Sequence, residues 1–335
     1  MIKYITNFYS SINSFEKALF VLLAFFPISL IIGNLFINLT FLIIAIIFII
    51  ELFVNKNTSF LKNIVFWLPT IFFLTLLINV LFSMDPSNSL SRVLKVLIMI
   101  PFIIQVKNLV SKYPAEFEKI IFGFWSLILF IVLLDVIFEI IFGFNTLGFK
   151  SPITMPSRIA SFFGDELVVG AFFLLFSPFF VSYFLKFYGH YLKTNLMIIL
   201  IFIIISFLIG ERSNFLKIFI IMSFIYFFIL KINFKKKFFG VVLLLSLLSI
   251  ILTFNSGAKY RYYEQIKSIY KKGGVTSYLQ KSKYGAHYDT AYKMFKEYPL
   301  FGIGIKNFRV ESGSKKYWDG RYKSTDGREY TLRWA

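Results

Sequence analysis

The sequence predicts an all-α membrane protein, a polytopic transmembrane helical bundle with a basic, partly helical tail. Of its 335 residues, 58% are hydrophobic and 21% aromatic, which exceeds the apolar share of typical soluble domains. The apolar residues also gather in runs of about 20, the length that a helix needs to cross a bilayer. The chain has no cysteine and two histidines. This composition excludes disulfides and thiolate metal sites and argues against a histidine-built metal centre, so no metal or other cofactor is predicted.

The rule of roughly 20 apolar residues gives about nine spans. They are expected at residues 17–33, 35–53, 64–83, 91–109, 119–142, 165–185, 194–210, 213–230 and 238–254. The first run lacks a small-residue cleavage site, which indicates a retained span and not a signal peptide. We therefore expect a transmembrane domain over residues 1–254 and a large loop region over 255–335, which we expect to be incomplete.

Lysines in alternate connections predict the orientation of the chain, because short cytoplasmic loops are enriched in Lys and Arg. The lysine-bearing connections hold Lys3 and Lys17; Lys56 and Lys62; Lys107, Lys112 and Lys119; Lys186 and Lys193; and Lys231, Lys235, Lys236 and Lys237. The N-terminus is therefore predicted to be cytoplasmic. The other connections, and everything after Asn255, are predicted to lie outside.

The tail over residues 255–335 is strongly basic, with 17 Lys and Arg against 7 Asp and Glu. Two explanations stay open: an anionic ligand such as a phosphorylated lipid, or attraction to anionic membrane lipids. No phosphate-binding loop of the nucleotide-binding kind is present, and no nucleic-acid partner is expected. The residues after Gly313 are expected to form an irregular polar loop. An amphipathic helix that stops before Pro299 is predicted from the spacing of Tyr288, Ala291, Tyr292 and Phe295.

Charged residues at the edge of a span are costly and are functional candidates for that reason. The first group, Gly210 to Asn214, joins two apolar runs. The planar guanidinium of Arg212 suits bidentate contact with a phosphate. Alternatively, Glu211 and Arg212 are turn charges or pair with each other.

The second group runs from Ser157 to Glu166 and leads into the sixth span. Arg158, Asp165 and Glu166 are candidates for substrate binding. Alternatively, Asp165 and Glu166 stabilise the start of the following helix, where the helix dipole favours negative charge.

The third group is Asp135 and Glu139, four residues apart and so on one helical face. They either line a polar cavity or pair with Arg158 or Arg92, and pairing is the favoured interpretation. The only histidine expected outside is His287, whose unperturbed pKa lies near neutrality.

Three segments together resemble the bacterial O-antigen ligases and O-antigen polymerases. Residues 206–216, with Gly210-Glu211-Arg212-Ser213-Asn214, resemble the arginine motif between two spans of that family. Residues 158–166 resemble its earlier outer-loop motif. Residues 288–308, with Pro299-Leu300-Phe301-Gly302-Ile303-Gly304, resemble a segment of its large periplasmic loop.

The resemblance implies a metal-independent transferase in the bacterial inner membrane, with the large loop in the periplasm. Ligases move a glycan from undecaprenyl diphosphate to lipid A-core, whereas polymerases move it to another glycan repeat. Arg212 matches the arginine that would hold the diphosphate and stabilise its charge as it leaves. A second basic residue is expected from Arg261, Lys283 or Arg309, and Glu211 is expected to help bind substrate.

The sequence departs from the family at the expected general base. In the family this base is a histidine late in the large loop, followed by further spans. The resemblance therefore predicts a reading frame that continues beyond Ala335, or the use of His287 as a substitute base. Two alternatives stay open: a transporter such as a lipid-linked oligosaccharide flippase, for which Asp135 and Glu139 are the best support, and a catalytically incomplete family member.

Overall fold

The computed structural model describes residues 2–56, 58–151, 158–164, 166–189, 192–271, 273–281, 283–314 and 316–317, and every regular element in this part is a helix. Seven helical segments are long and apolar enough to cross a membrane: Asn34–Asn55, Ile64–Leu81, Pro86–Lys112, Pro114–Phe142, Val169–Tyr188, Arg212–Ile229 and Phe234–Phe254. Two further predicted spans are a pair bent by 48°, Ser14–Ala24 and Phe26–Ile32, and the shorter helix Leu192–Leu208. The all-α, multi-pass class is confirmed.

The described residues fall into two compact units. Unit 1 comprises Met1–Thr40 and Leu109–Lys267, and unit 2 comprises Phe41–Asn108 and Ser268–Ala335. The boundary expected at residue 255 stays a prediction. The helix α4 (Asn34–Asn55) begins in unit 1 and ends in unit 2, and α14 (Gln265–Lys271) does the same.

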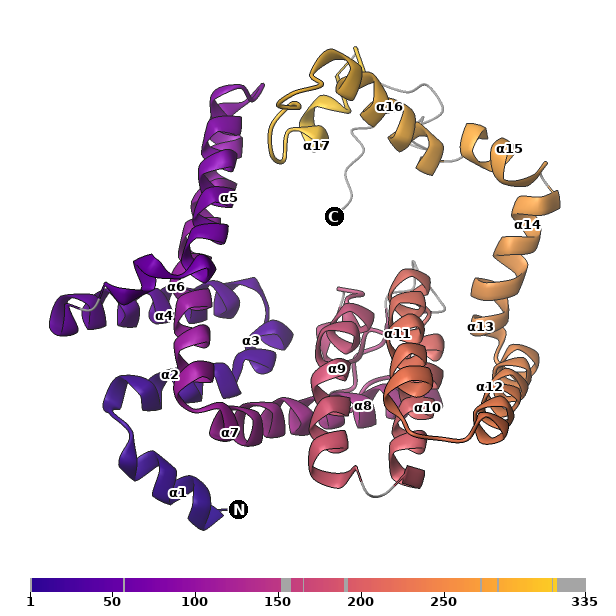
Figure 1. The fold of residues 1–335 in the computed structure, drawn as a ribbon. Coiled ribbons are helices and arrows are strands. Elements are labelled where there is room, and N and C mark those ends of the chain that lie inside the picture. Colours follow the sequence, from indigo (N-terminus) through magenta and orange to yellow (C-terminus); the bar gives the residue numbers. More distant parts are fainter. Residues whose placement is uncertain are drawn as a thin grey trace. The chain divides into compact units, whose positions relative to one another are not determined.

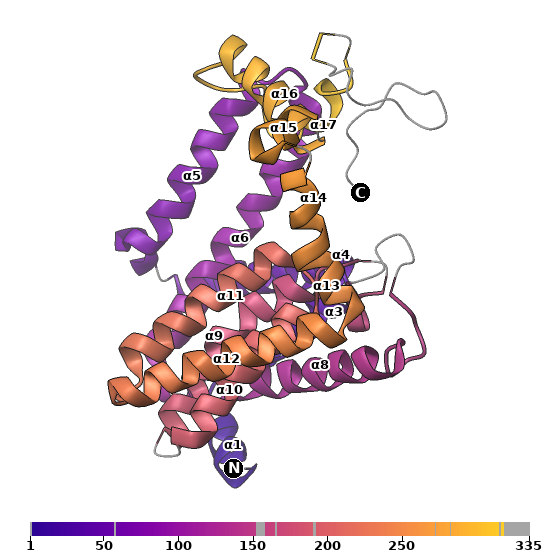
Figure 2. The ribbon, with the colours of Figure 1, turned by 90° about the vertical axis from the view of Figure 1, so that its right-hand side faces the viewer.

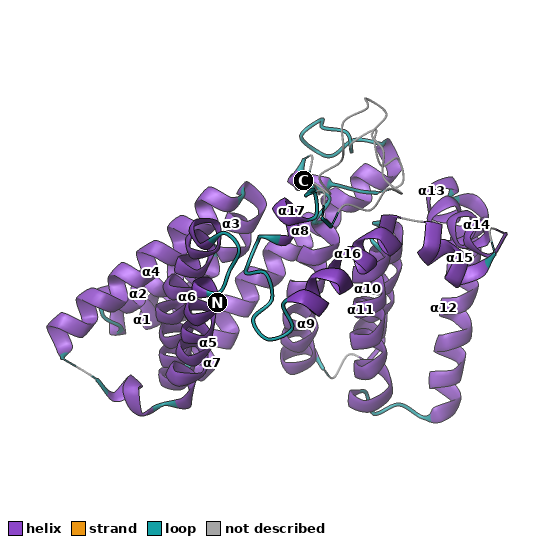
Figure 3. Ribbon diagram, turned by 90° about the horizontal axis from the view of Figure 1, so that it is seen from above, coloured by secondary structure: helices purple, strands orange, loops and turns teal. Residues whose placement is uncertain are grey.

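Unit 1 is built around four helices whose apolar side chains form its core (Figure 1). Phe173 and Phe176 of one helix, Leu129 of another and Ile209 at the end of a third are almost completely buried. Between membrane helices such packing is driven by van der Waals contact and hydrogen bonds. The four helices are α8 (Gly123–Phe142), α9 (Val169–Tyr188), α10 (Leu192–Leu208) and α11 (Arg212–Phe224). Seen from above, α9, α10 and α11 stand side by side (Figure 3).

The remaining elements of unit 1 precede, connect or follow the four core helices. The break between α2 and α3 falls at Phe25, and Pro27 in the first turn of α3 suits a helix start. The elements are α1 (Ile2–Ser11), α2 (Ser14–Ala24), α3 (Phe26–Ile32), α7 (Pro114–Glu116), η2 (Phe117–Phe122), η3 (Ser161–Phe163), η4 (Ile225–Ile229), α12 (Phe234–Phe254), α13 (Ser256–Lys259) and η5 (Tyr260–Glu264).

Unit 2 pairs two membrane helices with the later part of the tail (Figure 2). Its apolar core includes Phe73 and Val80 on one helix and Val93, Ile100 and Ile104 on the other. The elements are η1 (Ser59–Lys62), α5 (Ile64–Leu81), α6 (Pro86–Lys112), α15 (Gly274–Lys281), α16 (Lys283–Glu297) and α17 (Phe308–Glu311).

The helix predicted before Pro299 is confirmed as α16, which ends at Glu297. The aromatic stripe of this helix is not its buried face. Tyr288, Tyr292 and Phe295 are 69%, 58% and 60% exposed, whereas Thr290 and Met294 are buried. Met294 packs with Ile303 and Tyr317, and the Thr290 hydroxyl donates to the Tyr317 carbonyl at 3.2 Å. The small Thr290 lets this neighbouring segment approach the helix closely. Beyond Ser314 the predicted polar loop lies almost wholly outside the described residues.

The segment from Phe301 to Asn307 is fastened to the connection between α5 and α6. The Met84 N–H donates to the Ile303 carbonyl at 3.1 Å, and the Ser89 hydroxyl donates to the Ile305 carbonyl at 3.0 Å. The Asn307 side chain is 1% exposed, accepts from the Asn88 amide at 3.1 Å and donates to the Ile303 carbonyl at 2.9 Å.

Gly304 makes this close approach possible. Its φ is +93°, and a Cβ there would lie 2.2 Å from the Ser83 Cβ. Gly302 has a similar backbone, with φ of +66°, but a Cβ there would meet nothing within 4 Å. Comparing an alanine substitution at Gly304 with one at Gly302 therefore separates the free-energy cost of a left-handed backbone from that of a steric clash.

We predict that Gly304→Ala lowers the stability of the purified protein well beyond the roughly 1–3 kcal/mol expected for a strained backbone alone. Gly302→Ala is the control and should show only that smaller loss. Thermal unfolding in detergent and limited proteolysis of the tail measure both effects. Equal losses for the two variants would contradict the fastening described above.

Candidate functional site

Asp135 and Glu139 of α8 hold the connection that leads towards α9. Asp135 accepts hydrogen bonds from the Thr146 N–H at 2.8 Å, the Thr146 hydroxyl at 2.6 Å and the Ser161 hydroxyl at 2.6 Å. Glu139 accepts from the Ser151 hydroxyl and from the Ser161 N–H at 2.7 Å. Both carboxylates are buried, with 1% and 3% exposed.

This arrangement corrects the favoured interpretation of Asp135 and Glu139 as partners of Arg158 or Arg92. Within the described residues, their partners are hydroxyl and backbone N–H groups. Ser161, which both contact, has the left-handed φ of +53°, a strained conformation for a residue with a side chain. The two carboxylates therefore fix the backbone of the 158–164 segment.

Glu211 is the centre of a second buried group, at the start of α11. It forms an ion pair with Arg158, whose Nη2 lies 3.3 Å from Oε1, and it accepts from the Gly170 N–H at 3.1 Å. The Asn214 amide donates to its other oxygen at 2.5 Å. Glu211 is 7% exposed and the Arg158 side chain 19%. The carboxylate thus joins α9, α11 and the segment before α9.

Gly170 permits this contact because a Cβ at this position would lie 2.8 Å from the Glu211 carboxylate. The Arg158 guanidinium also donates to the Leu167 carbonyl at 2.8 Å. Arg158 is therefore engaged inside the protein. Of the alternatives for Glu211, an ordinary turn charge and a pair with Arg212 both disagree with this geometry.

Arg212 is the first residue of α11, next to Glu211. Its side chain is half-buried, and within the described part of the chain it has neither a hydrogen bond nor an ion pair. The N-cap residue of α11 makes no side-chain capping bond. The free N–H groups of a helix start and a guanidinium together favour an anion.

Arg261 and Tyr262 of η5 complete this end of unit 1. The Arg261 Nε donates to the Gly210 carbonyl at 3.1 Å. The Tyr262 ring stacks on Phe207, with centroids 4.0 Å apart, and its buried hydroxyl has no hydrogen-bond partner within the described residues. Burial raises the pKa of Tyr262, which the charges of Arg261 and Arg212 partly oppose. The hydroxyl stays protonated at neutral pH and can donate.

Sequence reasoning missed Tyr262, Gly170 and Asn214. Tyr262 had a usable signal in the sequence, since it follows Arg261 in the aromatic run Tyr260-Arg261-Tyr262-Tyr263. Gly170 and Asn214 gave no comparable signal, because their role depends on where the Glu211 carboxylate lies.

The other predicted site residues are Asp165, Glu166, Lys283, His287 and Arg309. Glu166 is exposed, and the N-cap of α9 is Val168, without a side-chain capping bond. Asp165 lies outside the described residues. In unit 2, His287 of α16 packs against Phe308, with ring centroids 6.2 Å apart, and Arg309 of α17 is exposed. Lys283 is the first residue of α16.

Within the described residues, no group of three or more His, Asp or Glu side chains is placed to hold a metal ion. The site is a set of arginines around a connection between two membrane helices: Arg158 is ion-paired, and Arg212 has no partner among the residues that the structure describes.

These features define a multi-pass helical membrane protein with an arginine-bearing connection between two spans. Residues 196–331 match a family model described as O-antigen ligase, so this part of the chain is similar to that family. The resemblance inferred from the motifs is thus confirmed. The match includes Arg212, Arg261 and His287, and it supports a function of the O-antigen ligase or polymerase type in general. No curated protein and no solved structure matches the chain.

We predict that Glu211→Gln destabilises the protein by on the order of 3 kcal/mol, because it leaves the Arg158 charge partly buried without its carboxylate. Glu166→Gln removes an exposed carboxylate close in sequence to Arg158. This control should change stability by less than about 0.5 kcal/mol. Thermal unfolding of both variants in the same detergent checks the difference. Similar midpoints for the two would show that the ion pair is not the stabilising contact.

Proposed function

We propose that the protein transfers a glycan from undecaprenyl diphosphate to lipid A-core, the O-antigen ligase reaction. The acceptor hydroxyl attacks the anomeric carbon of the donor sugar, and the bond from that carbon to the diphosphate oxygen breaks. The hydroxyl proton passes to a base, and undecaprenyl diphosphate leaves. The observation that carries the proposal is Arg212 at the start of α11, which has no partner within the described part of the chain and lies inside the part matched by the family model.

Arg212 is proposed to bind the diphosphate and to stabilise the negative charge that grows on it as the sugar departs. The free N–H groups at the start of α11 add to this positive field. Of the three predicted helpers, Arg261 is the one that belongs to unit 1, where it is held at the Gly210 carbonyl. Tyr262 is proposed to donate its unused hydroxyl to a donor oxygen. These groups supply the charge stabilisation without a metal ion.

The reaction is proposed to take place on the periplasmic face of the inner membrane. Contacts in both units support this orientation. In unit 1 the connection after α8 meets the α10–α11 connection, since the Ile159 N–H donates to the Ile209 carbonyl. In unit 2 the α5–α6 connection meets the tail. Each pair joins segments that the lysine pattern assigns to the same, outer side.

The transporter alternative loses its main support in this geometry. Its case rested on Asp135 and Glu139 as charges lining a polar path. Their oxygens instead accept hydrogen bonds from Thr146, Ser151 and Ser161, which are needed to hold a loop.

For the general base we propose His287, whose replacement by Ala should abolish transfer without preventing membrane insertion.

The polymerase alternative uses the same donor with a glycan repeat as acceptor. Lipopolysaccharide gels of a strain lacking the gene separate the two reactions. Loss of a ligase leaves bare core and lipid-linked polymer, which is the outcome we expect. Single repeats attached to the core would identify a polymerase instead.

We predict that Arg212→Ala reduces glycan transfer by at least about 100-fold while membrane insertion is kept, since losing one preorganised charge donor typically costs this much. Arg212→Lys should recover part of the activity, because it restores the charge but not the planar fork. Arg92→Ala, an exposed arginine on α6, is the control and should remain active. Full activity of Arg212→Ala would refute the assignment.

We predict that Tyr262→Phe keeps the stability of the protein, because the lost hydroxyl has no hydrogen-bond partner among the described residues. Transfer should fall about tenfold or more, since hydrogen bonds to charged groups contribute about 1.5–3 kcal/mol. The control is Tyr263→Phe, at an exposed ring. Thermal unfolding and transfer are measured side by side on both variants. Unchanged transfer would leave Tyr262 with only its stacking role.

A further inference from the structure

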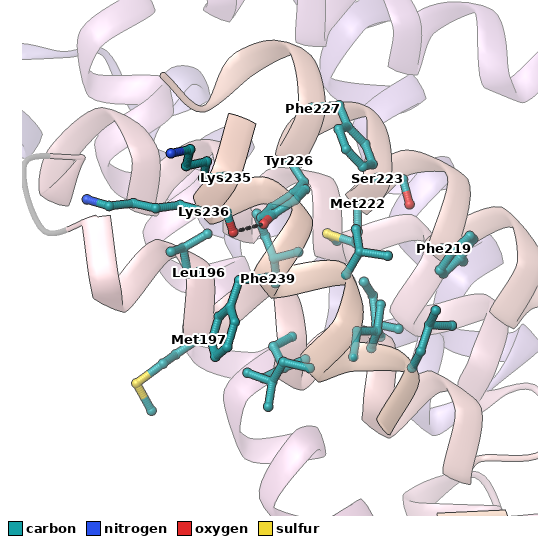
Figure 4. A pocket seen from close by; sticks show the side chains of 18 residues that line it. Leu196, Met197, Phe219, Met222, Ser223, Tyr226, Phe227, Lys235, Lys236 and Phe239 are labelled. Carbon is teal, nitrogen blue, oxygen red and sulfur yellow. Dashed lines mark hydrogen bonds between the residues drawn. The ribbon is translucent and has the colours of Figure 1, made fainter. Parts of the chain in front are cut away.

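A cavity of about 630 Å³ lies between α10, the α11–η4 segment and α12 in unit 1 (Figure 4). Its walls are apolar side chains such as Met197, Phe219, Met222 and Leu244. The volume falls within the range of about 300–1,000 Å³ that is usual for ligand pockets. Because these helices belong to a multi-pass membrane protein, lipid is the molecule that surrounds them.

The helix α12 contributes one wall but packs weakly. None of its residues is buried, although the helix is apolar and long enough to cross a membrane. Apolar helix faces in a bilayer are covered by protein or by lipid tails. Among the described residues, no helix covers this face of α12 closely, so the cavity has room for an apolar chain.

The two walls are fastened together at one end. The Tyr226 hydroxyl donates to the Lys237 carbonyl at 3.0 Å, and the Lys237 ammonium donates to the Phe227 carbonyl at 2.6 Å. Gly240 allows this approach, since a Cβ there would lie 2.2 Å from the Tyr226 oxygen. These contacts therefore hold the two walls of the cavity together at one end.

Positive charge gathers at that same end. Lys235 and Lys236 line the cavity and lie together on one side of it (Figure 4). Both are exposed, and neither forms an ion pair among the described residues. The segment from Lys231 to Lys237 contains four lysines and no carboxylate. A cationic rim on an apolar cavity between membrane helices matches an anionic lipid.

We propose that this cavity binds an anionic phospholipid of the surrounding membrane. One acyl chain lies between α10, α11 and α12, and the phosphate lies at Lys235 and Lys236. The site is separate from the proposed donor site, because Arg212 starts the α11–η4 span whereas Tyr226 and Phe227 lie near its other end. The bound lipid completes the packing of α12, and the proposal does not depend on the transferase assignment.

The test is native mass spectrometry of the purified protein with added phosphatidylglycerol or phosphatidylcholine. The protein should retain phosphatidylglycerol selectively. The double variant Lys235→Gln/Lys236→Gln should need about tenfold more phosphatidylglycerol for the same occupancy. Ser223→Trp, which places a bulky ring in the cavity wall, should abolish retention. The matched control is Lys56→Gln/Lys62→Gln, two exposed lysines outside the cavity, with the same loss of charge.

Four outcomes would overturn the proposal. The first is equal retention of the two lipids, and the second is an equal loss of retention in both double variants. The third is a dimer that excludes lipid, which would mean that a second copy of the chain covers α12. Displacement of phosphatidylglycerol by millimolar inorganic phosphate would also count against it, because only the head group would then be recognised. Thermal unfolding of each variant confirms that the fold is retained.

Discussion

The buried carboxylate of Glu211 is the constraint on which the site depends. A charge at the edge of a bilayer must be paired and hydrogen-bonded, because removing it from water costs several kcal/mol. Arg158, Gly170 and Asn214 meet this demand, and they come from three different segments. Satisfying one charge therefore assembles the end of the bundle. The Glu211 carboxylate also neutralises Arg158. Arg158 and Arg212, both close to this carboxylate, therefore have different roles.

The fold was largely predictable because the bilayer sets a length rule. Each of the predicted spans corresponds to an apolar helix, and the deviations are local. The first span is bent at Phe25, just before Pro27, and the seventh lies two residues earlier than predicted, at Leu192–Leu208. A run of apolar residues shows that a helix can cross the membrane. It contains no information on how such a helix bends or which neighbour it packs against.

The sequence predicted residues of the candidate site, but not which contacts they make. The spacing of Asp135 and Glu139 placed them on one helical face, and both do contact Ser161. Their actual partners are hydroxyl and backbone groups of a loop that becomes their neighbour only after folding. The same limit explains α16, where the aromatic spacing predicted the helix correctly but did not show which of its faces is buried. The packing there is decided by the small Thr290 and by Tyr317, 27 residues further along.

Arg212 occupies a position that electrostatics within the protein does not favour. A cation at the start of a helix opposes the helix dipole, at a cost of about 0.3–1 kcal/mol, and no described carboxylate forms an ion pair with Arg212. Arg261 shows the opposite case, since it donates to a carbonyl just beyond the end of α10, where positive charge is favourable. Residues that break a local rule without a compensating contact are expected at functional sites. An anion bound between Arg212 and the start of α11 would remove the conflict, and this is the physical reason to regard Arg212 as a ligand-binding residue and Arg158 as a structural one.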